Sequence, residues 1–543
     1  MKKTLILVTA LFSLTVFAQV GIGTTTPAGS SILDLTATNK ALLLTRVANT
    51  AAITNPVNGM LIYDISANCV KGFENGAWSG CLTATGSSGP GIGGTVTYSW
   101  ETELRFKQYA NVEFNRSNTL MSGGVTTDGK VFFWGRDYYG HIQGDGVTNG
   151  DAAHKASPVF MDGTGKWGTN AVKVQLANDG FYVLDSSGNI WSWGAQTQGQ
   201  LGDGVDGANV TVKRLFANVN NVAKPAGVTS FTDMVMRSNT LFALGNNGRV
   251  YYYGQNPNPS LGTSTVTATL MPLPAGVTSV AKMWLANQRN GSSFFMLGNN
   301  GELYSFTSNQ LLSGDSTVAS SAATLNYFTP TKVNLPAGEA SKVIKVDADI
   351  KTVFALTSDG KIYAWGRVKF DYGPSAGAAY GEINECMFND QTGITTVPNV
   401  YAHRYYYAYN PKLVKLPAGE TKFIDVSADD DTNHFLCESG TGYTLGYENR
   451  ALEAGVLGAN SSSFISYTDY QKTFAIEGIN AIKISSDGYT SLVLDASGKL
   501  WGFGDNRYCM SGAGFNCPAY IATALPLMNG NLDPNNPRPQ TVN

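Results

Sequence analysis

Residues 184–194 read Leu-Asp-Ser-Ser-Gly-Asn-Ile-Trp-Ser-Trp-Gly, and this stretch decides the fold because its pattern recurs along the chain. An aliphatic residue stands four positions before the Gly, and aromatic residues stand three and five positions after it. A Gly turn between apolar residues at even spacing indicates a β-hairpin. The pattern recurs at seven glycines: Gly129, Gly188, Gly248, Gly301, Gly360, Gly440 and Gly498. Spacings of 53 to 80 residues are typical of repeated blades or coils.

Each repeat also carries a strand ahead of the hairpin, as in residues 343–346, 423–426 and 482–484. Four repeats add a Pro-Ala-Gly turn before that strand, beginning at Pro225, Pro274, Pro336 and Pro417. About four short strands in about 60 residues make a propeller blade. The sequence therefore predicts an all-β fold, a seven-bladed β-propeller over residues 98–530. Residues 523–530 are expected to add an outer strand to the first blade, and residues 531–543 to form a disordered tail.

The stretch 189–194, followed by Gly-Gln-Leu-Gly-Asp-Gly at 199–204, resembles the repeat of the regulator-of-chromosome-condensation family. Residues 130–135 and 362–366 keep the first half of this motif, whereas Leu445 replaces the second aromatic residue in repeat six. The resemblance spans residues 100–530 and implies the propeller fold. Relatives in this family include nuclear exchange factors and secreted inhibitors of β-lactamases.

Residues 1–18 have the pattern of a secretory signal peptide. Lys2 and Lys3 precede an apolar stretch, and Val16 and Ala18 occupy the −3 and −1 positions of a cleavage site. No later stretch is long and apolar enough to span a bilayer. The sequence predicts a secreted, extracellular or outer-membrane surface protein, which favours the inhibitor-like over the nuclear relatives. A net charge of −3 without a Lys/Arg run argues against a nucleic-acid partner.

Residues 19–82 differ in composition from the repeats. The stretches 20–27, 40–46 and 58–63 resemble the N-terminal module of exported Bacteroidota proteins and segments of phage tail fibres. This resemblance implies a small β-rich stalk or assembly module that forms a homo-oligomer; a capping or spacer domain is the alternative. Residues 83–97 are rich in Gly, Ser and Thr, which is typical of a flexible linker.

Six cysteines fit an oxidising destination. Their positions predict one disulfide between Cys69 and Cys81 and a second between Cys509 and Cys517. Cys386 and Cys437 remain, and whether they pair is left open.

No catalytic signature is present. The four histidines, at positions 141, 154, 403 and 434, lack metal-type spacing, and nucleophile-elbow, zincin and phosphate-loop motifs are absent. Residues 429–431 and 144–151 are oxygen-rich enough for calcium, but they also fit ordinary turns. We expect no catalytic residues, no cofactor, no metal and no enzyme activity.

Two groups of residues are candidates for partner binding. One lies in the segments between the first and second strands of each repeat, which a propeller gathers at one end: Arg116, Arg237, Arg289, Asp429 and Tyr489. The other lies in the insertion that lengthens one repeat, where aromatic rings fall at every second position: Tyr401, His403, Tyr405, Tyr407 and Tyr409. In a strand these rings share one face. They would bind sugars or a protein partner, or else pack on the flank of the propeller.

These observations predict a cell-surface binding or adhesion protein that recognises a protein or glycan through propeller loops and the Tyr-rich insertion. The alternative is a structural subunit of a surface assembly, held together by residues 19–82. A third hypothesis, a hydrolase or lyase that uses a central pocket, has no supporting motif.

Overall fold

The computed structural model divides into two compact units, Met1–Glu101 and Thr102–Asn543. It describes residues 20–22, 33–35, 43–79, 104–114, 119–136, 154–177, 180–196, 198–205, 212–214, 216–237, 239–255, 264–286, 293–307, 310–317, 330–348, 352–371, 387–390, 392–398, 404–428, 432–448, 465–487, 490–505 and 520–526. The predicted signal peptide, linker and C-terminal tail lie outside these residues.

The N-terminal unit consists of small sheets. β1 (Val20–Ile22) pairs in parallel with β2 (Leu33–Leu35). A second sheet has the order β3 (Arg46–Val47), β4 (Met60–Asp64), β5 (Cys69–Glu74) and β6 (Ala77–Trp78), with the single-turn helix η1 (Thr50–Ala52) before β4. Ile62 and Phe73 are buried, and the Phe73 ring meets Trp78 edge to face at 5.1 Å. The prediction of a small β-rich module is confirmed.

The described strands of the second unit form seven sheets in chain order, which we call blades 1 to 7. Blade 1 contains β7 (Phe106–Phe114), β8 (Thr119–Thr126), β9 (Val131–Arg136) and β10 (His154–Met161). Blade 2 contains β11 (Ala171–Ala177), β12 (Gly180–Asp185), β13 (Ile190–Gln196), β14 (Val212–Arg214) and β15 (Asn220–Asn221). Blade 3 contains β16 (Phe231–Arg237), β17 (Thr240–Gly245), β18 (Val250–Gln255) and β19 (Ser264–Leu270).

Blade 4 contains β20 (Val280–Ala286), β21 (Ser293–Gly298), β22 (Leu303–Phe306) and β23 (Thr331–Lys332). Blade 5 contains β24 (Val343–Ala348), β25 (Thr352–Thr357), β26 (Ile362–Asp371), β27 (Ile394–Pro398) and β28 (Arg404–Leu413). Blade 6 contains β29 (Phe423–Ala428), β30 (Thr432–Cys437), β31 (Gly442–Glu448) and β32 (Ile465–Lys472). Blade 7 contains β33 (Ala481–Asp487), β34 (Thr490–Asp495), β35 (Leu500–Asp505) and β36 (Tyr520–Pro526). The described helices of this unit are single turns: η4 (Phe216–Asn218), η6 (Gln310–Leu312), η7 (Ala340–Lys342) and η9 (Phe474–Ile476).

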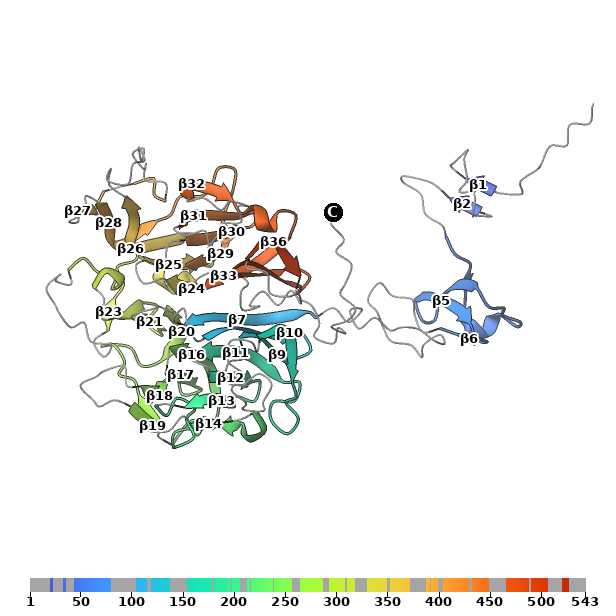
Figure 1. The fold of residues 1–543 in the computed structure, drawn as a ribbon, viewed down its shortest axis with the longest axis horizontal. Coiled ribbons are helices and arrows are strands. Elements are labelled where there is room, and N and C mark those ends of the chain that lie inside the picture. Colours follow the sequence, from blue (N-terminus) through green and yellow to red (C-terminus); the bar gives the residue numbers. More distant parts are fainter. Residues whose placement is uncertain are drawn as a thin grey trace, which may run out of the picture. The chain divides into compact units, whose positions relative to one another are not determined.

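The blades close into a ring around their first strands (Figure 1). In each sheet the first strand is an edge strand, and it contacts the first strands of the preceding and following blades. The last of these contacts joins β33 to β7 and so returns to blade 1. The prediction of an all-β propeller is therefore confirmed.

The recurring pattern occupies the same place in every blade. All seven hairpin glycines have positive φ, between 73° and 84°, a conformation that other residues adopt only with strain. The aliphatic residue four positions before the Gly is buried in each case, as is the residue five positions after it, including Leu445. These apolar positions form the cores between neighbouring blades, as in the cluster that joins Phe133 of blade 1 to Trp193 of blade 2.

The first aromatic residue of the pattern has a second role, because its polar tip binds the turn. Trp191 Nε1 donates to Asp185 at 2.9 Å, and Trp501 Nε1 donates to Asp495 at the same distance. Both aspartates also accept backbone N–H groups of their own hairpin turns. The aromatic residue thus stabilises the Gly turn as well as packing beside it.

The predicted closure of the ring is wrong. β36 pairs with β35 and completes blade 7, whereas β10 is the outer strand of blade 1. Each blade is therefore built from one continuous segment of chain. The sequence identified this segment as an outer strand but could not specify which blade it joins, because every blade ends with an outer strand.

Candidate binding surfaces

The propeller has two ends with different contents. The hairpin turns and the beginnings of the first strands meet at one end, which we call the hairpin end; the Phe231 amide, for example, donates to the carbonyl of Gly188 at 2.9 Å. The first strands end and the second strands begin at the opposite end, which we call the loop end. The structure tests the predicted loop platform at one residue. Arg237 is the last residue of β16, and Arg116, Arg289, Asp429 and Tyr489 lie outside the described residues.

Residues 404–409 of the Tyr-rich run lie in the strand β28, where the sequence left the conformation open. β28 lies between β26 and β27 and widens the sheet of blade 5. Tyr405 is a residue of this strand. Alternation places Tyr407 and Tyr409 on one face, and their rings lie 6.2 Å apart. On the other face Ala408 is buried opposite Ile394. Tyr401 and His403 lie outside the described residues.

Tyr407 and Tyr409 are half-buried, which fits either role that the sequence left open. The strand itself is held against blade 4. The Asn410 side chain accepts from the Ser316 amide at 3.0 Å and donates to the Ser316 hydroxyl at 3.0 Å. A rigidly held strand with half-exposed aromatic rings presents contact area at a low entropic cost.

A second set of polar residues surrounds the axis of the ring. The first strand of every blade has a register shift, a β-bulge, at its second residue, and a polar residue follows each bulge. We call these seven residues the belt: Gln108, Lys173, Asp233, Lys282, Lys345, Asp425 and Lys483. Since the first strands contact one another in order, the belt forms a ring at one level of the propeller.

Several belt residues join one blade to the next. Lys173 Nζ lies 2.7 Å from Asp233, and Lys345 Nζ lies 2.8 Å from Asp425. Asp425 accepts in addition from the Ile484 amide of blade 7 at 2.8 Å. These bonds run around the ring and tie the first strands together.

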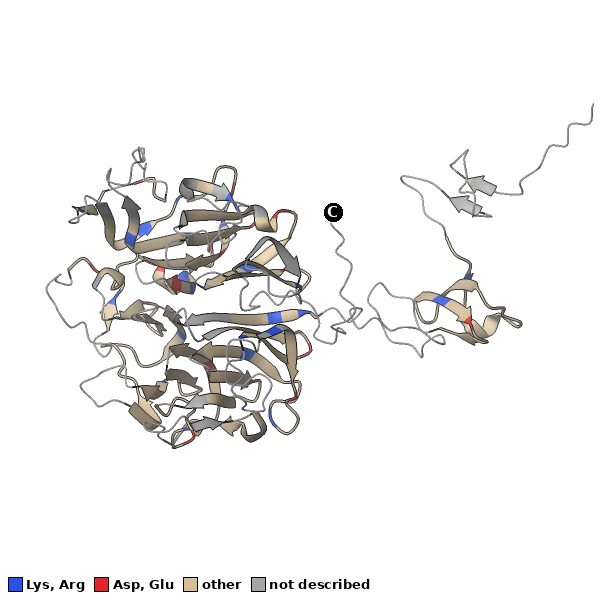
Figure 2. Cartoon of the chain, viewed as in Figure 1, with Lys and Arg blue, Asp and Glu red and all other residues tan. Residues whose placement is uncertain are grey.

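The densest charge of the belt lies beside β24, where Figure 2 shows blue and red bands next to each other. Lys345 lies between Asp425 and Asp347. Burial raises the pKa of Asp347 to about 6, despite the nearby lysine. Burial also raises the pKa of the Tyr109 hydroxyl in blade 1, and the carboxylates of Asp425 and Asp347 add to this effect. The carboxylates of blades 5 and 6 thus interact electrostatically with a side chain of blade 1.

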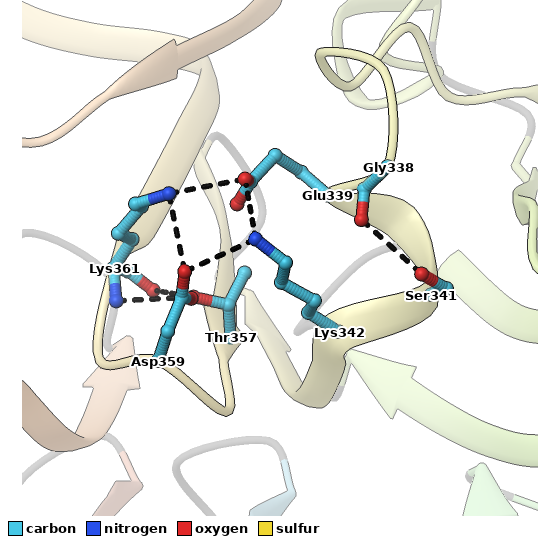
Figure 3. A network of polar contacts seen from close by, with 7 residues as sticks. All are labelled: Gly338, Glu339, Ser341, Lys342, Thr357, Asp359 and Lys361. Atoms are coloured by element: carbon cyan, nitrogen blue, oxygen red, sulfur yellow. Dashed lines mark hydrogen bonds and ion pairs between the residues drawn. The ribbon is translucent and has the colours of Figure 1, made fainter.

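A polar network ties the hairpin end of blade 5 together (Figure 3). Lys342 and Lys361 both contact the Glu339 carboxylate, at 2.9 and 3.0 Å, and both contact Asp359, at 3.2 and 3.1 Å. Two lysines and two carboxylates balance in charge. The network therefore joins the connecting turn to the hairpin and leaves no net charge for a ligand.

The described residues contain no group of three or more His, Cys, Asp or Glu side chains that could hold a metal. Both calcium candidates, residues 144–151 and 429–431, lie outside them. His434 is buried in β30, where burial lowers the pKa of the imidazole to about 4. Within the described chain, none of the helices is long and apolar enough to cross a membrane.

The cysteine predictions are tested in part. Cys69 is disulfide-bonded, and its predicted partner Cys81 lies outside the described residues, as do Cys509 and Cys517. Cys437 is a buried free thiol, so the bridge to Cys386 that the sequence left open is not formed.

The belt was not predicted from the sequence, although the sequence contains a signal for it. In six blades a lysine or aspartate directly precedes the buried aliphatic or Met residue of the first strand, as in Lys345-Val346 and Asp425-Val426.

Comparison with known proteins supports both parts of the architecture. Residues 21–93 match the family model described as "Phage tail like trimerisation region". The chain is similar to the regulator of chromosome condensation of Xenopus laevis, 25% identical over 56% of this chain and 72% of that protein. The human regulator of chromosome condensation is 25% identical over 45% of this chain and 57% of its own length.

The structure of Prp20p from Saccharomyces cerevisiae, described together with its binding to Gsp1p and histones, superimposes with a TM-score of 0.55. The superposition covers 75% of this chain and 87% of that chain at 15% identity, which shows a shared fold. The chain is thus similar to regulator-of-chromosome-condensation propellers and carries a phage-tail-like trimerisation region, as the sequence predicted.

Proposed function

We propose that this chain is a secreted or cell-surface protein whose propeller recognises a macromolecular partner and whose N-terminal unit assembles several copies. One observation carries the proposal: a single chain joins a unit that matches a trimerisation region to a propeller similar to one that binds proteins. Non-covalent recognition needs no catalytic group. Four charged belt residues are held in ion pairs and hydrogen bonds between blades, whereas Lys282 and Lys483 are exposed.

The surface of the N-terminal unit supports assembly. Five large apolar side chains are more than half exposed there: Ile22, Leu43, Val57, Leu61 and Ile65. Leu61 lies on the face of β4 opposite to the buried Ile62 and Asp64. A small unit with this much exposed apolar surface gains stability when copies cover it. The same observation supports the alternative role, a structural subunit of a surface assembly.

Assembly can be tested on the mature chain from residue 19. We expect discrete trimers in analytical ultracentrifugation, and Leu61→Asp should dissociate them because it places a charge in the apolar contact. Leu270→Asp is the matched control, since Leu270 is a similarly exposed leucine of β19 in blade 3. A monomeric wild-type protein, or equal dissociation by both variants, would overturn assembly through this unit.

Recognition can be tested by affinity capture from native cell-envelope extracts. The Tyr407→Ser/Tyr409→Ser variant should lose the retained partner if β28 contacts it, whereas Leu270→Ser should retain it. Circular dichroism and urea unfolding separate lost binding from lost folding. Empty captures by folded wild-type protein would favour the structural role, and turnover of a polysaccharide or peptide substrate would overturn the non-enzymatic proposal.

A further inference from the structure

Three consecutive blades present an isoleucine at the same place on the inner edge of the propeller. Ile344, Ile424 and Ile482 are the bulged residues of β24, β29 and β33, and we call them the isoleucine arc. These strands contact one another in that order, near the middle of the ring in Figure 1. The bulges lie near the beginnings of the strands, so the arc belongs to the hairpin end.

The arc is exposed because of the bulge. A bulged residue has no partner on the neighbouring strand, and the first strand has no neighbour on its inner side. Ile344 is 44% exposed and Ile482 is 39% exposed, while Ile424 is half-buried. Elsewhere in the ring the same position holds Lys107, Val172, Thr232 and Ala281. Val172 of blade 2 is also 38% exposed, but blades 5 to 7 are the three consecutive blades that carry isoleucine at this position.

Exposed lysines border the arc on both sides. Lys282 of blade 4 and Lys483 of blade 7 are exposed belt residues, and Lys107 takes the bulge position of blade 1. None of the three has a carboxylate partner among the described residues. By contrast, the carboxylates within the arc are already bound. Asp347 of β24 and Asp425 of β29 both contact Lys345, and both accept from backbone amides.

We infer that the isoleucine arc and its bordering lysines bind an acidic peptide segment of a partner protein, with one apolar side chain of that segment against the isoleucines. Positive charge on both sides complements carboxylates, which would orient the segment and speed its encounter. Branched aliphatic side chains favour an aliphatic contact, since sugar and base recognition uses aromatic rings. The inference deepens the proposed recognition function and rests on it.

The test uses fluorescence anisotropy with the full mature protein and three labelled synthetic peptides. One peptide has a leucine flanked by glutamates, the second replaces the leucine with serine, and the third replaces the glutamates with lysines. We expect the first peptide to bind, and its affinity to fall about tenfold in each of the other two. Its affinity should also fall as salt is added, because exposed charges are screened.

Matched variants locate the site. Ile344→Asn/Ile482→Asn should weaken the acidic leucine peptide about tenfold, whereas Leu270→Asn, on a similarly exposed strand position, should not. Lys282→Glu/Lys483→Glu should transfer binding to the lysine peptide, whereas Lys472→Glu, an exposed residue of outer strand β32, should leave the preference unchanged. All six substituted sites are exposed, so folding is retained and can be verified by urea unfolding.

Failure of this inference is distinguishable from failure of the proposed function. Protein that captures an envelope partner but ignores the acidic leucine peptide, or binds all three peptides equally, overturns the inference and leaves surface recognition standing. Protein that binds the peptide through the arc but captures no envelope partner supports the site and overturns cell-surface recognition.

Discussion

The amide of Phe106, which begins β7, donates a 2.6 Å hydrogen bond to the carbonyl of Gly498 in the hairpin of blade 7. The same bond links other blades: Phe231 to Gly188, Val280 to Gly248 and Phe423 to Gly360. The ring is therefore closed by the bond that joins its consecutive blades. Blade 7 meets blade 1 through the same contact that joins the other consecutive blades. Closure of the ring therefore does not need an outer strand exchanged between the first and last blades.

Substitution of the hairpin glycines should separate backbone strain from crowding. A Cβ on Gly498 would lie 3.3 Å from the nearest atom, so Gly498→Ala should cost about 1 kcal/mol, from its positive φ alone. A Cβ on Gly188 would lie 2.3 Å from Ser230 Cβ, so Gly188→Ala should cost about 3 kcal/mol or more. Urea unfolding measures both. Gly498→Asn should be milder than Gly498→Ala because Asn tolerates this conformation; equal losses at Gly188 and Gly498 would contradict the crowding argument.

The carboxylate of Asp185 should contribute strongly to the stability of its hairpin. Asp185→Ala leaves the amides of Ser187 and Asn189 and the Trp191 indole without their acceptor, and we expect a loss of about 3 kcal/mol. Asp162→Ala is the control, since Asp162 lies in an exposed turn and, among the described residues, accepts hydrogen bonds from Thr164 alone. Unfolding midpoints should rank the two variants in that order. A smaller effect at Asp185 would show that water replaces the carboxylate.

Acid should destabilise the propeller through His434. Its folded pKa of about 4 lies below the ordinary value of 6.5, so the unfolded chain binds the proton more readily between these pH values. Stability is therefore lost as the pH falls from 6.5 to 4, by about 3 kcal/mol from this residue.

His434→Gln should retain a hydrogen bond to Thr444 and lose less stability over this range. Asp347, whose pKa is raised, contributes the opposite dependence in both proteins and cancels from the difference. Urea unfolding at several pH values provides the measurement, and parallel curves for wild type and variant would refute the role of His434.

Cys437 should be unreactive in the native protein. Burial, reinforced by Glu420, raises the pKa of its thiol to about 12, so almost no thiolate is present at neutral pH. Iodoacetamide labelling followed by peptide mapping should modify Cys437 only after denaturation. Cys437→Ser should leave the disulfide map unchanged. Labelling of native Cys437, or a bridge to Cys386, would contradict the buried free thiol.

Local sequence determined the repeating unit. Positive φ at the hairpin glycines and burial at Leu184 and Trp193 follow from short-range patterns, because turn geometry and strand alternation act over a few residues. The same locality explains the wrong assignment of residues 523–530. Any blade can accept an outer strand, and chain continuity decides which blade receives it.

Tertiary structure alone decided what lies around the axis. The partners Lys345 and Asp425 are 80 residues apart in the chain, and the isoleucines of the arc belong to three different repeats. Each repeat shows only one residue of each set. Ring closure brings these single residues into one belt and one arc, because equivalent positions of adjacent first strands come to the same level. The sequence by itself therefore determined the blade, and closure of the blades into a ring determined the surface that a partner would meet.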